Sequence, residues 1–287
     1  MNLDNHIVSA GSTVLLKDHD PDDTGKYKSK EDAAKDLQAD VETLTALQDV
    51  LYAGNSHALL LIFQAMDAAG KDSVIKHVMS GVNPQGCQVV SFKVPSAEEL
   101  DHDYLWRSLK ALPERGRIGI FNRSYYEEVL VVRVHPEFLQ KQSIPGDDVK
   151  GSLWKKRYED INAVEKYLSR NGTVILKFFL NVSRKEQKER FLERMNTPEK
   201  NWKYSAADVK ERSYWKEYMS AYEEMLGSTS TQWAPWHVIP ADHKWFTRVL
   251  VARIIIDKLK SLKLSYPRLT EQQQADLLKA KESLLRE

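Results

Sequence analysis

Short apolar runs separated by helical periodicity predict five strands, each followed by a helix. The first strand is the unbroken run Leu59–Phe63, which is typical of a parallel strand buried on both faces. Further strands are expected at Cys87–Phe92, Arg117–Phe121, Thr173–Leu180 and Trp236–Ile239. Because strands and helices alternate, we expect an α/β fold with one five-stranded parallel sheet and helices on both faces.

Apolar residues at helical spacing predict the helices themselves. Glu31–Tyr52 carries an apolar stripe that we expect to pack against the core or a second subunit. The other expected helices cover Ser96–Leu112, Asp148–Ser169, Ser183–Met195, Ala207–Leu226 and Trp245–Leu262. In two of them the capping serine, Ser96 or Ser183, is followed three residues later by a glutamate, which marks a helix start.

The segment after the first strand has the composition of a phosphate-binding loop. A strand, a small polar loop (AMDAAGKDS, 65–73) and a helix in this order gather free backbone N–H groups and a positive helix end at one point. The match to G-x-x-x-x-G-K-[ST] is imperfect, because Ala65 replaces the first glycine and Asp72 the Mg²⁺-binding Ser or Thr. We expect Lys71 to add its charge to this cradle, and an ordinary βα turn is the alternative. The expected cradle residues are Ala68, Ala69, Gly70, Lys71, Asp72 and Ser73.

Candidate groups for chemistry also follow the third strand. Asn122 stands where a P-loop sheet normally carries the Walker B aspartate, and Glu127 could restore the missing charge. Asp67 offers a carboxylate suited to a hard cation such as Mg²⁺, with turn capping as the alternative. Arg123 would point at the same site, or would form a surface ion pair with Glu127 or Glu128.

Two further segments carry candidate binding residues. Arg190 and Arg194 share a helix face, and Lys200 and Lys203 follow in a polar loop, which suits a lid over phosphates or a solvated helix. Asp103 and Arg107 lie over the part of the sheet where nucleoside monophosphate kinases bind their acceptor. Arg107 could hold an acceptor phosphate, or it could pair with Asp103. We expect the tryptophans to serve packing rather than base stacking.

Composition narrows the classes of function. The chain has 287 residues, with 42 basic residues against 41 acidic ones, so bulk charge predicts neither a nucleic acid nor a membrane partner. The single cysteine, Cys87, permits no intrachain disulfide and fits a reducing compartment. With no signal-peptide pattern and no run near the ~20 apolar residues of a membrane span, the expected location is the cytoplasm.

Several motifs in order resemble the polyphosphate kinase 2 family. They are AMDAAGKDS, DYLWR (103–107), FNRSYYEEVLVVRVHP (121–136), KFFLNVSRKEQKERF and TPEKNWK. The resemblance implies a three-layer P-loop kinase fold, similar to thymidylate kinase, with a helical lid. It also implies reversible phosphoryl transfer from inorganic polyphosphate to AMP or ADP, or to GMP or GDP, with Mg²⁺ (or Mn²⁺) as cofactor.

The resemblance carries over residue by residue. Asp67 and Lys71 match the Walker A residues, Asn122 and Arg123 the Walker B pair, and Arg133 the later arginine of that segment. The lid residues are matched by Arg190, Arg194, Lys200 and Lys203. Many members have Asp at the position of Asn122, which leaves Glu127 as the candidate substitute for a metal ligand beside Asp67. The FNRS-x-YE form resembles the branch that accepts both monophosphates and diphosphates, and members of the family are homo-oligomers, here expected as a dimer or tetramer.

The expected organisation has three parts. Residues 1–56 form an N-terminal arm and helix, 57–264 the kinase core with the lid at about 190–212, and 265–287 a polar tail. Two other functions remain open on the sequence alone. One is an ATP-dependent nucleotide kinase, and the other is a non-catalytic polyphosphate-binding protein, which would fit the missing Walker B aspartate.

Overall fold

Five strands form one all-parallel sheet in the computed structural model, which describes residues 1–144 and 152–287. The strands are β1 (Ala58–Gln64), β2 (Cys87–Ser91), β3 (Ile118–Asn122), β4 (Thr173–Asn181) and β5 (Trp236–Pro240). Their order is β2-β3-β1-β4-β5, which confirms the predicted sheet. β1 is central and buried along its whole length, as its apolar run predicts.

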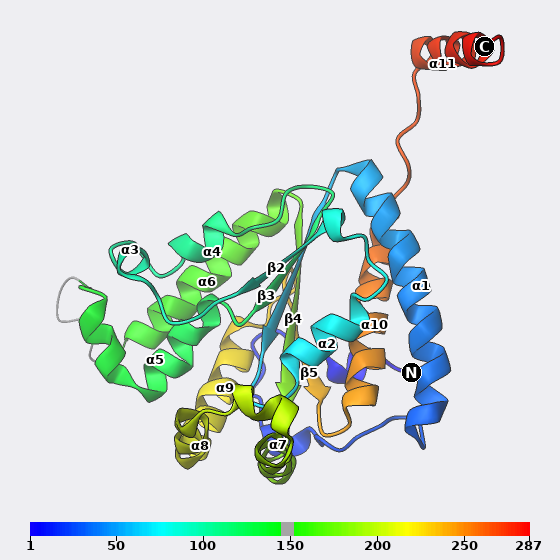
Figure 1. Ribbon diagram of the computed structural model, residues 1–287. Coiled ribbons are helices and arrows are strands. Elements are labelled where there is room, and N and C mark those ends of the chain that lie inside the picture. Colours follow the sequence, from blue (N-terminus) through cyan, green and yellow to red (C-terminus); the bar gives the residue numbers. More distant parts are fainter. Residues whose placement is uncertain (145–151) are drawn as a thin grey trace.

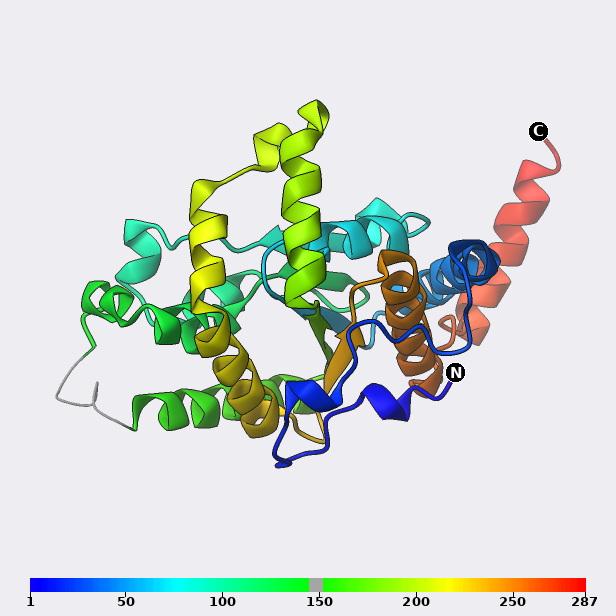
Figure 2. The same ribbon diagram turned by 90° about the horizontal axis from the view of Figure 1, so that it is seen from below.

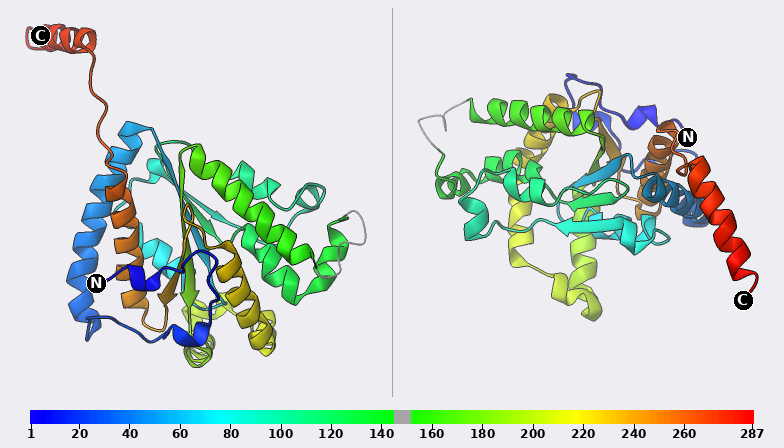
Figure 3. Two further views of the ribbon diagram at one scale, coloured as in Figure 1. Left: turned by 180° about the vertical axis from the view of Figure 1, so that it is seen from behind. Right: turned by 90° about the horizontal axis from the view of Figure 1, so that it is seen from above.

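Helices cover both faces of the sheet and give three layers (Figure 1). One face carries α1 (Lys30–Gly54), α2 (Lys71–Val78) and α10 (Lys244–Ser261). The other carries α4 (Trp106–Lys110), α6 (Leu153–Arg170) and α9 (Trp215–Thr229), as Figure 3 also shows. The remaining α-helices are α3 (Ala97–Leu100), α5 (Val131–Val134), α7 (Arg184–Asn196), α8 (Ala206–Glu211) and α11 (Glu271–Leu284). Short 3₁₀ turns lie at Asp4–His6, Leu16–Asp18, Pro84–Gly86, Tyr125–Val129 (η4), Pro136–Lys141 (η5), Pro198–Lys203 (η6) and Arg212–Tyr214 (η7).

The two long helices α1 and α10 pack on each other. The consecutive residues Val249, Leu250 and Val251 of α10 are all fully buried. Three consecutive buried residues point to different sides of a helix, so this part of α10 is covered on several sides, by the sheet within and by α1 outside. Leu44 and Leu51 of the α1 stripe are likewise buried within the chain, so the packing predicted for this stripe is found inside one subunit.

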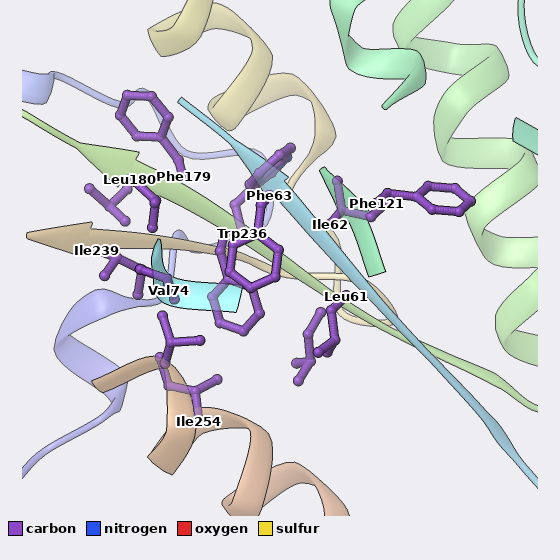
Figure 4. Close-up of a cluster of buried hydrophobic side chains, with 14 of the residues drawn as sticks. Leu61, Ile62, Phe63, Val74, Phe121, Phe179, Leu180, Trp236, Ile239 and Ile254 are labelled. Carbon is purple, nitrogen blue, oxygen red and sulfur yellow. The ribbon is translucent and has the colours of Figure 1, made fainter. Parts of the chain in front are cut away.

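The apolar core lies on both faces of the central strands (Figure 4). The rings of Phe63 on β1 and Phe178 on β4 stack at 5.0 Å between centroids. Burying a side chain of this size stabilises the fold by about 1.5–3 kcal/mol. Figure 4 labels Leu61, Ile62, Phe63, Val74, Phe121, Phe179, Leu180, Trp236, Ile239 and Ile254.

A buried ion pair lies in this core below η4. The amine of Lys177 on β4 donates to Glu165 on α6 at 2.6 Å, and both side chains are fully buried. The amine also donates to the Tyr126 hydroxyl at 2.8 Å, and Glu165 accepts from both Tyr125 and Tyr126 at 2.9 and 2.7 Å. The network therefore ties η4, the turn after β3, to β4 and α6.

The N-terminal arm packs against the sheet edge at β5. The Val8 N–H donates to the Trp236 carbonyl at 2.9 Å, and Ile7 forms an antiparallel bridge with His237. Further along, the Asn181 amide donates to the His19 carbonyl at 2.8 Å. Figure 2 shows this dark blue segment running past α9 and α10. The arm thus covers an edge that would otherwise offer unpaired backbone groups.

Two predicted helices are broken in the structure. In place of one helix over 96–112 there are α3 and α4, because the Asp103 carboxylate accepts from the Leu105 N–H at 2.9 Å and forms a turn between them. In place of one helix over 207–226 there are α8 and α9, separated by η7. The predicted start of α6 at Asp148 lies outside the described residues, and the described helix begins at Leu153.

The polar tail stands apart from the body. Its helix α11 begins at a capping box made by Thr270 and Gln273. The helix is exposed along its whole length (Figures 1 and 3). Within the described ranges, none of the helices is long and apolar enough to cross a membrane.

Candidate active site

The loop between β1 and α2 lies where the chain leaves the sheet in opposite directions. The connection after β1 leads to α2 on one face, whereas the connection after β3 leads to α6 on the other. Ligands of open parallel sheets bind in the crevice that such a divergence creates at the carboxyl ends of the strands. The register places Phe63 of β1 beside Asn122 of β3, so the two loops begin side by side.

The loop has the backbone of a phosphate cradle. Gly70 precedes the first residue of α2 and has a φ of 110°, a conformation that L-residues rarely adopt. Glycine offers no side chain to cap the first turn of α2, and the positive end of the helix dipole at this turn favours an anion. The sequence predicts this arrangement from the order of strand, loop and helix.

Lys71 lies beneath the loop. Its side chain is buried, with the residue 8% exposed, and its amine donates to the Ala65 carbonyl at 3.0 Å. Burial, followed by the positive charge of Arg123, lowers the pKa of Lys71 to about 8. An ammonium in such surroundings gains more from phosphate charge than an exposed lysine would, because little water competes for it.

Arg123 joins the two predicted metal-binding acids. Its guanidinium contacts the Asp67 carboxylate at 2.7 Å and the Glu127 carboxylate at 3.6 Å. The negative charge of Glu127, followed by that of Asp67, raises the pKa of Arg123 against the opposing effect of burial. Its backbone φ is 64°, a strained value for a residue with a side chain, and such strain concentrates at functional sites. The ion pair with Glu127, considered above as an alternative to a site role, is present within the site itself.

Asn122 contacts the loop through Asp72. Its amide nitrogen donates to an oxygen of the Asp72 carboxylate at 2.8 Å. Glu127 in turn accepts from the Gln64 amide at 2.9 Å. In the part of the chain that the structure describes, the histidines, cysteines and acids form no group of three or more that could hold a metal by itself. A metal here would therefore need ligands from a substrate as well.

These groups line one cavity of about 1000 Å³ at the carboxyl edge of the sheet. The predicted residues that line it are Asp67, Ala68, Gly70, Lys71, Asp72, Ser73, Arg107, Asn122, Arg123, Glu127, Arg190, Arg194 and Lys200. Ala69 lies in the loop, and its carbonyl accepts from Arg190 at 2.7 Å. The structure thus brings together most of the residues predicted from separate segments.

Three predicted residues are placed elsewhere or are not described. Arg133 donates to the Tyr158 hydroxyl at 2.8 Å and pairs with Glu224 on α9, so it contacts α6 and α9 instead of the cavity. Asp103 lines a separate hollow of about 480 Å³ beside the cavity. The side chain of Lys203 lies outside what the structure describes.

Arg107 lies between the cavity and this hollow. Of its two predicted roles, pairing with Asp103 is wrong: its partner is Glu99 at 3.4 Å, and it donates to the Lys93 carbonyl at 2.8 Å. Its guanidinium also lies 5.3 Å from the centroid of the Phe92 ring. Asp103 is instead occupied in the turn between α3 and α4.

Sequence reasoning missed four basic residues that line the same cavity. They are Lys93, Lys141, Lys244 and Arg248. Arg248 donates to the hydroxyl of Ser73 in the loop at 2.8 Å, although the two residues are 175 positions apart. These residues belong to no motif, and only the fold brings α10 and η5 beside the loop. Trp202 is 78% exposed and lines the cavity.

The predicted lid covers α7, η6 and α8, and Figure 2 shows these elements projecting from the body. Residues of α7 and η6 line the cavity. Its outer cations have acidic partners, with Lys200 2.6 Å from Glu193 and Arg194 4.0 Å from Asp208. Arg190 is different, because its guanidinium is buried and donates to loop carbonyls. The lid root therefore contacts the phosphate loop directly.

Comparison with known proteins identifies relatives along most of the chain. Residues 27–267 match the family model described as Polyphosphate kinase 2 (PPK2). The chain is 56% identical over 261 residues to an ADP-polyphosphate phosphotransferase of Rhodopseudomonas palustris, covering 91% of this chain and 90% of that protein. It is 45% identical over 253 residues to an AMP/ADP-polyphosphate phosphotransferase of Meiothermus ruber, covering 88% and 91%. A crystal structure of Polyphosphate Kinase 2 from Arthrobacter aurescens TC1 superposes with a TM-score of 0.86 at 40% identity and covers 97% of this chain and 95% of that one.

Proposed function

Because this chain belongs to the polyphosphate kinase 2 family, we propose that it transfers a phosphoryl group from inorganic polyphosphate to ADP, and also to AMP, in a reversible reaction. The observation that carries the proposal is the basic cavity in which the loop N–H groups, Lys71 and Arg123 meet. Polyphosphate and nucleotide phosphates are both polyanions, and this cavity offers both of them cations on a rigid sheet edge.

Phosphoryl transfer between two phosphates depends on positioned reactants and on positive charge more than on a general base. A nucleotide phosphate is ionised at neutral pH and is itself the attacking group, so no residue has to remove a proton from it. We assign the loop N–H groups and Lys71 to the donor phosphate that is transferred. Arg123, held between Asp67 and Glu127, would stabilise charge on the group in transit.

The donor set of the site fits a hard divalent cation. Asp67 and Glu127 supply carboxylates and Asn122 an amide oxygen, and Mg²⁺ in phosphoryl-transfer sites is bound by one or two carboxylates together with substrate phosphates. We therefore propose that these three residues hold Mg²⁺, with Mn²⁺ as an alternative that prefers the same oxygen ligands. The ion, when bound, would neutralise charge on the bridged phosphate oxygens. Arg123 would then share the Asp67 and Glu127 carboxylates with the ion, or release them to it.

The nucleotide would lie toward the ends of β2 and β3. Arg107 lines the cavity there and also borders the hollow that contains Asp103, so a phosphate near Arg107 would leave the base beside Asp103. Guanine nucleotides are included in the proposed substrate range. The proposed polyphosphate contacts on the lid are Arg194, Lys200 and Lys203, with Arg133 as a more distant candidate. Arg190, predicted with them, donates instead to the loop carbonyls of Ala68 and Ala69.

We also propose that the protein is a homo-oligomer, either a dimer or a tetramer, because the family that it resembles forms homo-oligomers. The α1 stripe gives it no added support, because Leu44 and Leu51 are buried within one chain. Light scattering on the purified protein would give the subunit number directly.

The test is a donor and acceptor matrix. ADP, AMP, GDP and GMP are each incubated with Mg²⁺ and long-chain polyphosphate as the only donor, and the products are separated by chromatography. We expect ATP from ADP, and loss of this product in Lys71→Met. Turnover with ATP but not with polyphosphate as donor would favour an ordinary nucleotide kinase instead. Binding of polyphosphate without turnover of any nucleotide would favour a non-catalytic role and refute the proposal.

A further inference from the structure

Every carbonyl of the phosphate loop from residue 65 to 69 accepts a hydrogen bond from a side chain. Lys71 donates to the first two, at 3.0 Å for Ala65 and 3.5 Å for Met66. The amide of Gln187 donates to the Asp67 carbonyl at 2.8 Å. Arg190 donates through one nitrogen to the carbonyls of residues 68 and 69, at 3.0 and 2.7 Å.

Gln187 and Arg190 lie on α7, at the root of the lid, and are 1% and 4% exposed. The second terminal nitrogen of Arg190 donates to the carbonyls of Ala241 and Asp242 at 2.6 and 2.9 Å, and its Nε donates to Glu186 at 2.7 Å. Arg190 therefore joins the phosphate loop to the turn after β5. All its nitrogens are committed to protein acceptors, which is the geometry of a structural clamp.

The direction of these bonds determines which way the loop amides point. In a trans peptide the C=O and the following N–H point in opposite directions. Where Gln187 holds the carbonyl of residue 67 toward α7, the N–H of Ala68 is turned away from α7, and Arg190 does the same for the N–H of Gly70. The two donors also cover carbonyl oxygens whose partial negative charge would repel a phosphate.

We propose that Gln187 and Arg190 are positioning residues for phosphoryl transfer, because they hold the loop carbonyls against α7 and keep the N–H groups of Ala68 and Gly70 turned toward the substrate phosphates. The Ala69 N–H donates to the Met66 carbonyl at 3.3 Å and closes the turn of the loop. The inference rests on the proposed function for its catalytic part, whereas the loop geometry can be tested without turnover. Arg212 of η7 extends the link, since its guanidinium donates to the side-chain oxygen of Gln187. The far end of the lid is thereby connected to the backbone of Asp67.

Gln187→Glu tests the bond to the loop with little change in volume. The carboxylate keeps an acceptor for Arg212 but loses the donor to the Asp67 carbonyl. We expect faster hydrogen exchange at the N–H groups of residues 67–71, with unchanged exchange in β4 and α10. We expect kcat/KM to fall about tenfold to a hundredfold, the range for removal of one buried hydrogen bond that acts in the transition state. The loss should fall on kcat rather than on KM for the nucleotide.

Arg190→Ala tests the clamp by chemical rescue. Millimolar guanidinium chloride should restore part of kcat, because the free ion can refill the vacated position, and Arg190→Lys should retain less activity than the rescued protein. The matched control is Glu189→Gln, an exposed neighbour on the same helix whose loop exchange and kinetics should equal those of the parent. If guanidinium leaves kcat unchanged, and loop exchange in Gln187→Glu equals that of the parent, the proposal is wrong.

Two results separate this inference from the proposed function. If the parent protein shows no polyphosphate-dependent turnover, the proposed function is refuted. The positioning role of Gln187 and Arg190 is then still tested by hydrogen exchange in the loop and by calorimetric binding of tripolyphosphate. If exchange in the variants rises equally throughout α7 and the sheet, the residues only stabilise the fold and the inference is refuted even though turnover remains.

Discussion

Replacing Asn122 by aspartate should make the stability of the chain depend on a divalent cation. In the structure the amide of Asn122 donates to the Asp72 carboxylate at 2.8 Å. The Asn122→Asp substitution replaces this donor by a second carboxylate, so an attraction becomes a repulsion between like charges at contact distance. A cation that bridges the two carboxylates would reverse the effect.

The size of the effect follows from the contact. A lost hydrogen bond to a charged group costs about 1.5–3 kcal/mol. Two unit charges roughly 4 Å apart repel by about 1 kcal/mol in water and about 4 kcal/mol at an effective dielectric constant of 20. Because Asp72 is exposed and Asn122 half-buried, the low ends apply, and we expect a total loss of about 2–3 kcal/mol, or roughly 4–10 °C in Tm. Metal at a hundredfold excess over its Kd would return about 2.7 kcal/mol by mass action.

The assay is thermal unfolding in EDTA and in rising Mg²⁺. Asn122→Asp should melt below the parent in EDTA and regain the difference as Mg²⁺ is added. The matched control is the exchanged pair Asn122→Asp/Asp72→Asn, which restores one amide against one carboxylate and should melt with the parent in EDTA. Equal Tm values for Asn122→Asp and the parent in EDTA, or superimposable Mg²⁺ titrations of the single and double variants, would show that the two side chains do not interact as described.

Three further outcomes can be measured. Lys71→Met should lower kcat by about 10²–10³-fold with little change in Tm, because it removes a buried charge beside the migrating phosphate; activity within a factor of a few would contradict the cradle. Lys177→Met should cost about 3–5 kcal/mol in urea unfolding, because it leaves Glu165 buried without its cation, and Lys177→Met/Glu165→Leu should recover most of this; equal losses in both variants would exclude the ion pair as the cause. Burial lowers the pKa of His237 from its ordinary value of 6.5 to about 4. As the pH falls from 6.5 to 4, this histidine is protonated in the unfolded chain but stays neutral in the folded one, so the folded state loses stability over this range. Between pH 7 and pH 5 the parent should lose about 2 kcal/mol more than His237→Gln, and parallel urea midpoints for the two proteins would refute this.

The features that local sequence predicts well are those determined by neighbouring residues. Buried parallel strands are continuous apolar runs, which made β1, β3, β4 and β5 predictable, whereas β2 is partly exposed and was located by its β-branched residues. The loop could be placed because strand and helix flank it. The breaks in the two long predicted helices were not predicted, because apolar residues at helical spacing continue across them. Asp103 closes one break.

The site was predictable only where its residues belong to motifs. Asp67, Lys71, Asn122, Arg123 and Glu127 follow strand ends that the pattern locates, and they line one cavity. The cations from α10 and η5 could not be assigned, because their place beside the loop depends on how distant helices pack. A basic residue on a helix also looks the same in sequence whether it faces a phosphate or a carbonyl, and Arg190 illustrates this ambiguity.

The arm that covers β5 has a consequence for the order in which this chain matures on the ribosome. Residues 7 and 8 are translated well before their partners at positions 236 and 237. Until β5 has been made, the arm lacks its partner and the outer edge of β4 is unpaired, so nascent molecules on one messenger expose both to each other. We expect deletion of the arm to reduce soluble yield in cells more than it reduces the activity of the protein that does fold.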